Sequence, residues 1–265
     1  MKLKKQKKRH FFHIVDYSPW PLLIATAALF FTLSLGVYFT RIEYSLLSVY
    51  WQLFLIILIM YKWWKDVNTE SVFLGAHTRI VVKGLWLGFL LFMLSEVMIF
   101  FVFFWGYFHY SLTTAYEIGF YWPSVGVSLV KTYRLPLLNT LILILSGITL
   151  TIAHKSLLIG DYRNTQIRLI LTILLGLTFE ILQVMEYSLI PYNMNDAVFG
   201  NIFYFLTGLH GFHVLVGIIF LTVCFVRLKK GYLLKESHIG FEFAIWYWHF
   251  VDIVWILLFF VVYWW

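Results

Sequence analysis

Seven long apolar stretches alternate with short polar segments along the chain. A run of about 20 apolar residues is long enough for an α-helix to cross the ~30 Å hydrocarbon core of a bilayer. The pattern therefore predicts an all-α integral membrane protein, with a single polytopic domain over residues 1–265. The predicted transmembrane spans are about 21–40, 45–61, 84–109, 135–153, 169–189, 198–226 and 243–265.

The third stretch, residues 84–109, holds a single formal charge, that of Glu96, close to its middle. A charged side chain near the bilayer midplane costs at least ~2.5–3.5 kcal/mol unless it is protonated, paired or turned inward. Two interpretations remain open at this point. Glu96 is either a hydrogen-bonding residue that joins helices, or a functional acid that faces a proton path or a bound polar headgroup.

Composition excludes a soluble domain. The chain is 62% apolar and only 12% charged, so in water it would expose far too much apolar surface. Its net charge of +7 could suggest a nucleic acid partner, but the Lys and Arg residues lie at the ends of apolar stretches, where they act as topological anchors. We therefore expect a membrane environment and no nucleic acid. The lone Cys224 excludes a disulfide within the chain.

The positive residues are strongly biased to one side of the predicted membrane. Six precede the first span, and the second, fourth and sixth loops hold four, three and four, so that 17 of the 20 Lys and Arg residues lie on the amino-terminal side. Loops rich in Lys and Arg remain on the cytoplasmic side of a membrane. Because seven spans place the termini on opposite sides, the sequence predicts an inner amino terminus and an outer carboxyl terminus.

Four ionisable residues of the last two spans are candidates for chemistry. His210 and His213 are three residues apart and share a face of the sixth span, so they could ligate a metal or a haem. The favoured interpretation is hydrogen bonding between helices, because several glycines beside them allow close helix packing. His249 and Asp252 also share a helix face, and we expect this pair to be buried and to serve packing.

The fifth span carries two acids, Glu180 and Glu186, and we assign Glu186 to buried packing as well. A protein-held haem needs axial His or Met residues, and a two-thiolate copper site needs two cysteines. The chain has one cysteine and no CxxCH motif. We therefore expect no catalytic residue and no metal site in this chain. From these residues alone, the reaction in which the chain takes part stays unassigned.

Ordered motifs run through the chain from near its start to its end. They are HFFHIVDYSPWP at 10–21, WWKDVNTES at 63–71, GAHTRIVVKG at 75–84, LFMLSEVMIFFVFFWGYFHYSL at 91–112, PLLNT at 136–140, QVMEY at 183–187, TGLHGFHVLVG at 207–217 and GFEFAIWYWHFVDIVWILLFFVVYWW at 240–265. In order and spacing the chain resembles cytochrome c oxidase subunit III, and the resemblance covers almost its whole length.

The resemblance implies a core subunit of respiratory complex IV, which transfers electrons from cytochrome c to oxygen and pumps protons. In this family subunit III holds no redox centre, so the enzyme's haem and copper are expected in partner subunits. The implied partners are subunits I and II, accessory subunits and structural phospholipids, with subunit III stabilising the catalytic subunit I. The implied location is the mitochondrial inner membrane with the amino terminus in the matrix, and a bacterial plasma membrane is the less favoured choice.

The resemblance also implies an arrangement of the helices and a set of lipid contacts. Spans one and two form one bundle and spans three to seven another, with a phospholipid-holding cleft between the bundles. The positions that match lipid-associated residues of the family are Glu96, His77, Trp63, Trp64 and Arg227.

The chain departs from the family pattern at four positions. Lys155 follows His154 where a pair of histidines is usual, and Ser237 replaces the first histidine of a second pair. Trp86 stands where relatives have an arginine, and Glu180 stands where a Thr-like residue is common. These departures leave the resemblance intact but weaken any transfer of the family's complete headgroup contacts to this chain.

An alternative from another functional class is a stand-alone proton or small-solute transporter. Such a protein would also bury Glu96, Glu180 and Glu186 in its spans. It should purify as an autonomous unit and transport alone, whereas an oxidase subunit should purify with a haem-bearing partner.

Overall fold

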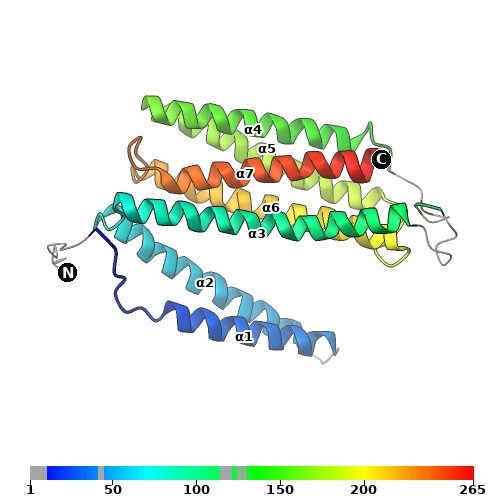
Figure 1. Cartoon of the computed structure of the whole chain (residues 1–265), viewed down its shortest axis with the longest axis horizontal. Helices are drawn as coiled ribbons and strands as arrows, with labels where there is room; N and C mark the ends of the chain where they lie inside the picture. Colours follow the sequence, from blue (N-terminus) through cyan, green and yellow to red (C-terminus); the bar gives the residue numbers. More distant parts are fainter. Residues whose placement is uncertain (1–10, 41–44, 114–120, 124–126, 128–129) are drawn as a thin grey trace. The chain divides into compact units, whose positions relative to one another are not determined.

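The computed structural model describes residues 11–40, 45–113, 121–123, 127 and 130–265. Over these residues the chain forms seven long α-helices (Figure 1). A π-helical segment follows the last of them. The elements are α1 (Trp20–Phe39), α2 (Ser45–Val72), α3 (Arg79–Leu112), α4 (Leu135–Ile159), α5 (Tyr162–Leu189), α6 (Val198–Lys229), α7 (Ile239–Leu258) and η2 (Phe259–Trp264).

The seven predicted spans are confirmed as helices that are long and apolar enough to cross a membrane. Several helices continue past the apolar stretch, since α2 runs on to Val72 and α3 already begins at Arg79. Backbone hydrogen bonding can continue where polar side chains meet water, so a helix can be longer than its hydrophobic span. The described residues form no β-strand, and an isolated bridge joins Leu234 to Ser237.

The chain divides into two compact units, Met1–Leu87 and Gly88–Trp265, and the boundary falls inside α3. In the first unit α1 and α2 pack together as a helical hairpin. The indole Nε1 of Trp20 donates a hydrogen bond of 2.7 Å to Oδ2 of Asp66, which joins the start of α1 to the distal part of α2. This bond fixes the register of the hairpin at one end.

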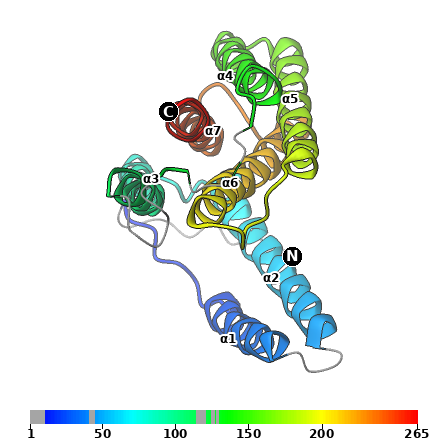
Figure 2. The same cartoon turned by 90° about the vertical axis from the view of Figure 1, so that its right-hand side faces the viewer.

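The second unit has a core of closely packed helices, in which α4, α5, α6 and α7 lie together (Figure 2). Its largest buried side chains are Trp248 and Trp255 of α7. The indole of Trp248 donates to Ser146 Oγ over 2.9 Å, so its one polar atom is satisfied inside the core. Gly176 and Gly217 flank the same indole, where an added Cβ would lie only 2.6 Å and 2.9 Å from ring carbons. These glycines therefore let α5 and α6 approach α7.

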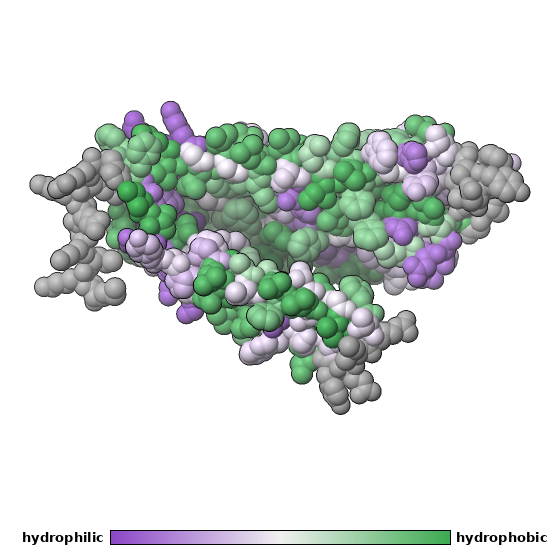
Figure 3. Space-filling view, turned by 60° about the horizontal axis from the view of Figure 1, so that its bottom comes forward, coloured by the Kyte–Doolittle hydropathy of each residue, from purple (hydrophilic) through white to green (hydrophobic). Residues whose placement is uncertain are grey.

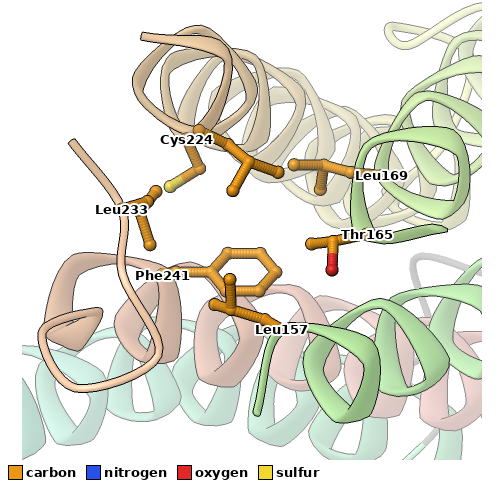
Figure 4. Close-up of a pocket in the computed structure, with 7 residues that line it drawn as sticks. Leu157, Thr165, Leu169, Cys224, Leu233 and Phe241 are labelled. Carbon is orange, nitrogen blue, oxygen red and sulfur yellow. The ribbon is translucent and has the colours of Figure 1, made fainter. Parts of the chain in front are cut away.

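Side chains of α4, α5, α6, α7 and the α6–α7 connection meet at one end of this unit (Figure 4). They are Leu157, Thr165, Leu169, Cys224, Leu228, Leu233 and Phe241. The space among them leaves no room for a water molecule. Cys224 is buried here, and we interpret this cluster as close packing rather than a ligand site.

The turn between α4 and α5 is set by local chemistry. Gly160 ends α4 with a positive φ of 91°, a conformation that glycine adopts without strain. Asp161 then caps α5, because its Oδ1 accepts a hydrogen bond of 3.1 Å from the backbone N–H of Asn164. The backbone and side-chain hydrogen bonds from Asn164 lower the pKa of Asp161.

Apolar side chains cover most of the face seen in Figure 3. Large hydrophobic residues are exposed along the helices, for example Leu141 on α4 and Ile181 on α5. Contiguous apolar surface of this kind suits acyl chains or other membrane helices, and it would promote aggregation in water.

Candidate functional site

Glu96 meets a histidine of another helix in the second unit. Its Oε2 lies 2.7 Å from Nε2 of His213, so the contact joins α3 to α6. On the other side of the imidazole, Nδ1 lies 2.7 Å from the carbonyl oxygen of Leu209, one turn earlier in α6. A carbonyl oxygen only accepts, so the hydrogen is on Nδ1 and Nε2 faces the carboxyl group.

One further proton completes this Glu96–His213 contact. If the proton is on the carboxyl group it is donated to Nε2, and if it is on the imidazole the two side chains form an ion pair. The net charge of the two residues is zero in both cases, which avoids an isolated charge in the membrane. The surroundings are aromatic, with the rings of Phe100 and Tyr247 centred 5.1 Å and 6.3 Å from the His213 ring. The geometry thus makes the helix-joining contact that was one of the two interpretations of Glu96.

His249 and Asp252 form a second pair on α7, with Nδ1 3.4 Å from Oδ2. Asp252 is buried against Gly147 of α4, where an added Cβ would lie 2.5 Å from Oδ2. His249 is less buried than Asp252 within this chain, with 40% of its side chain exposed. The ring lies at the edge of the bundle, where its Nε2 is 3.4 Å from Oγ1 of Thr151.

His210 and Glu186 are both almost completely buried in the second unit. The ring of His210 packs against Phe179 and Trp255, at centroid distances of 5.6 Å and 5.1 Å. Within the part of the chain that the structure describes, no hydrogen-bond partner faces either ring nitrogen of His210. The carboxyl group of Glu186 has the hydroxyl of Tyr263 as a hydrogen-bonding neighbour. His213 contacts Glu96, whereas His210 packs against aromatic rings. The two histidines of α6 therefore do not converge on one site where they could bind the same metal or haem.

The candidate lipid residues are distributed over both units. His77, Trp63 and Trp64 belong to the first unit, where His77 and Trp63 are half-buried and Trp64 is 58% exposed. Arg227 belongs to the second unit, and its Nη1 lies 2.8 Å from the position that a Cβ on Gly240 would occupy. The absence of a side chain at Gly240 therefore leaves space for the guanidinium group between the ends of α6 and α7.

Sequence reasoning missed two residues beside His77. Nε2 of His13 lies 3.9 Å from Oε2 of Glu70, and the rings of His13 and His77 are 6.2 Å apart. All three residues stand in motifs quoted above, but their separation along the chain gave no sign that they meet.

A second group in the described residues has the same composition, and it too was missed. The potential ligand atoms of His154, His238 and Glu242 lie within 4.8 Å of one another, at adjoining ends of α4 and α7. The three residues are half-buried, and we assign no metal to them. The shared i,i+4 spacing of His238 and Glu242 was the only local signal.

Together, seven membrane-crossing helices and buried acid–histidine contacts define a multi-pass helical membrane protein. Residues 10–265 match the family model described as cytochrome c oxidase subunit III. Cytochrome c oxidase subunit 3 of Arabidopsis thaliana is 44% identical over 260 residues, which are 98% of this chain and 98% of that protein. The same-named protein of Chondrus crispus is 45% identical over 267 residues, which are 99% of this chain and 97% of that protein. The same-named protein of Drosophila yakuba is 45% identical over 256 residues, which are 97% of each chain.

The chain belongs to the cytochrome c oxidase subunit III family. This confirms the resemblance drawn from the ordered motifs. It supports a subunit of complex IV, and a stand-alone transporter is not favoured.

Proposed function

We propose that the chain is a non-redox subunit of cytochrome c oxidase that stabilises the catalytic subunit I. Membership of the subunit III family supports its place in the complex. The observation that carries its structural role is the Glu96–His213 contact, because this pair of ionisable residues in the membrane is used to join α3 to α6. Subunits I and II and accessory subunits are the partners in this proposal, and haem and copper belong to those partners.

The test is to purify the assembled oxidase in mild detergent and then separate this chain from it. We expect the chain to co-purify with a haem-bearing partner, and the separated chain to lack haem absorbance and stoichiometric copper. Stoichiometric iron or copper in the separated chain would contradict a non-redox role. Failure to co-purify with any haem protein would contradict the place in the complex.

The second part of the proposal is phospholipid binding in a cleft between α1–α2 and the other five helices. The support is chemical, because Arg227 offers a guanidinium for a phosphate and His77 a further donor, while Trp63 and Trp64 suit the membrane interface. Glu96 is placed beside this lipid by the family resemblance. Its contact with His213 satisfies one carboxyl oxygen, Oε2, and leaves Oε1 for a lipid or water.

Native mass spectrometry of the oxidase with its lipids tests this second part. We expect Arg227→Ala to lose a phospholipid that the unchanged complex retains, since the phosphate loses its cation. Lys230→Ala is the matched control, because Lys230 is an exposed cation three residues further along. Equal lipid retention in both variants would contradict a specific phosphate site at Arg227.

The third part concerns location and orientation. We infer a mitochondrial inner membrane with the amino terminus in the matrix, which is supported by eukaryotic relatives and by the 17 positive residues on that side. Tags at the two ends should differ in protease accessibility in sealed membranes. Cleavage of both tags from the same side would contradict the orientation.

A further inference from the structure

Glu180 lies on α5, well inside the membrane. It is 18 residues from Tyr162 at the start of the helix and nine from Leu189 at its end, or ~27 Å and ~14 Å along the axis. The whole helix is ~42 Å long. If a hydrocarbon core of ~30 Å is centred on the helix, Glu180 lies ~8 Å inside the nearer edge of that core. A carboxyl group at this depth needs a partner or a proton.

Glu180 has no such partner in the described residues. Its Oε1 is buried and meets no hydrogen-bond donor, and no described side chain forms an ion pair with it. This contrasts with Glu96, which has His213. On α6, Gly211 lies opposite, and the two oxygens of Glu180 would be 3.5 Å and 3.8 Å from an added Cβ. The carboxyl group therefore lies against α6 at Gly211.

The residues around Glu180 form an exposed surface of the second unit. Glu180 is only half-buried, and Ile181 and Val184 beside it on α5 are 60% and 65% exposed. On α6, Gly208 is exposed and Phe212 is 61% exposed. Small residues such as Gly208 let the backbone of another membrane helix approach closely. We call this the α5–α6 surface. It consists of Glu180, Ile181, Val184, Gly208 and Phe212, and it combines an unpaired acid with space for the backbone of another helix.

The sequence restricts what could pair with Glu180. Residues 20–39 and 45–61, which include all of α1 and the apolar part of α2, contain no Lys, Arg or His. Acyl chains have no hydrogen-bond donor, and the headgroups of bilayer lipids that are not held in a protein cleft lie at the interface rather than at this depth. A basic side chain for Glu180 must therefore come from another polypeptide in the membrane.

We propose that the α5–α6 surface is a docking surface for a transmembrane helix of another oxidase subunit, which presents a basic side chain to the carboxylate of Glu180. The complementary charge removes the cost of an unpaired acid in the membrane, and Gly208 gives the partner helix its close approach. The proposal rests on the place of the chain in complex IV and is independent of the lipid cleft. Glu180 is also one of the positions at which the chain departs from the family pattern, so the docking residue on the partner is expected to be specific to this oxidase.

Photocrosslinking in the assembled oxidase tests the occupant of this surface. A benzophenone side chain in place of Phe212 should cross-link to a membrane segment of another subunit that contains Lys, Arg or His at the matching depth. Leu145 on α4 is the control, because it is 49% exposed and lies well inside a different membrane-spanning helix, ~15 Å from the start of α4. Cross-links from position 212 that go only to phospholipid, or only to residues 20–72 of this chain, would overturn the proposal.

A second measurement tests the charge itself. Glu180→Leu should reduce the cross-link from position 212 about fivefold, as loss of an interhelical contact of ~1 kcal/mol predicts, while the cross-links from position 145 stay constant. Thr178→Leu, at an exposed polar residue of the same helix, should change neither. An unchanged cross-link in Glu180→Leu would overturn the role of the carboxylate. If the chain stays in the haem-bearing complex in that case, only the docking surface fails and the proposed function stands.

Discussion

Two acids in the second unit reach α6 from opposite sides, and they differ in what they find there. Glu96 on α3 meets the imidazole of His213 at 2.7 Å. Glu180 on α5 meets the bare backbone at Gly211. The first acid is satisfied within the chain and joins two of its helices, whereas for the second we propose a partner from outside the chain. An acid in a membrane helix can therefore serve either the fold or the assembly, and its neighbour on the next helix decides which.

Breaking the internal pair should have the largest effect. We expect His213→Leu to destabilise the subunit by ~3–5 kcal/mol, because it leaves Glu96 without its partner in an apolar environment. Thermal unfolding of the purified oxidase, followed through this subunit's dissociation, measures the loss.

A double-mutant cycle provides the control for this prediction. Glu96→Gln combined with His213→Leu should cost less than the sum of the two single changes, since the amide is neutral and the unpaired charge is gone. Additive losses would mean that the two side chains do not act as a pair.

Two glycines that face acids offer an intermediate test. Gly147→Ala would place a Cβ 2.5 Å from Oδ2 of the buried Asp252, so we expect ~1–3 kcal/mol of destabilisation from overpacking. Gly211→Ala would place its Cβ 3.5 Å from Glu180, an ordinary contact, and should change stability by less than ~1 kcal/mol. The same unfolding measurement compares them. A larger loss for Gly211→Ala would show that the space between Gly211 and Glu180 is already tightly filled.

Asp161, which is fully exposed, should give the smallest effect and a distinct pH dependence. Its pKa is lowered in the folded protein by hydrogen bonds from Asn164, so its contribution to stability is present above the ordinary Asp range and is lost as pH falls through the folded pKa. Asp161→Ala should therefore lower the unfolding temperature slightly at neutral pH, and the difference from the unchanged protein should shrink in acid. Asp161→Asn keeps a capping side chain, so it should show little pH dependence relative to the alanine variant. A difference that grows as pH falls would contradict this sign.

Length and composition determined the number and nature of the helices. Whether a stretch can cross a bilayer depends on its own 20 or so residues, so all seven helices could be predicted without knowing what each one touches. The family could also be predicted, because ordered motifs carry it along the chain. The ends of the helices were less predictable, since α2 continues to Val72 through polar residues that an apolar run does not include.

The partners of the ionisable residues were decided by the tertiary structure alone. Glu96 and His213 are 117 residues apart, and nothing local relates them. Whether two such residues meet depends on the rotation of each helix about its axis and on its shift along a neighbour, which side-chain packing sets. The same rotation turns His249 toward the edge of the bundle and leaves Glu180 facing a glycine. A local run of apolar residues fixes that a helix forms, but only packing against its neighbours fixes which of its faces meets a partner.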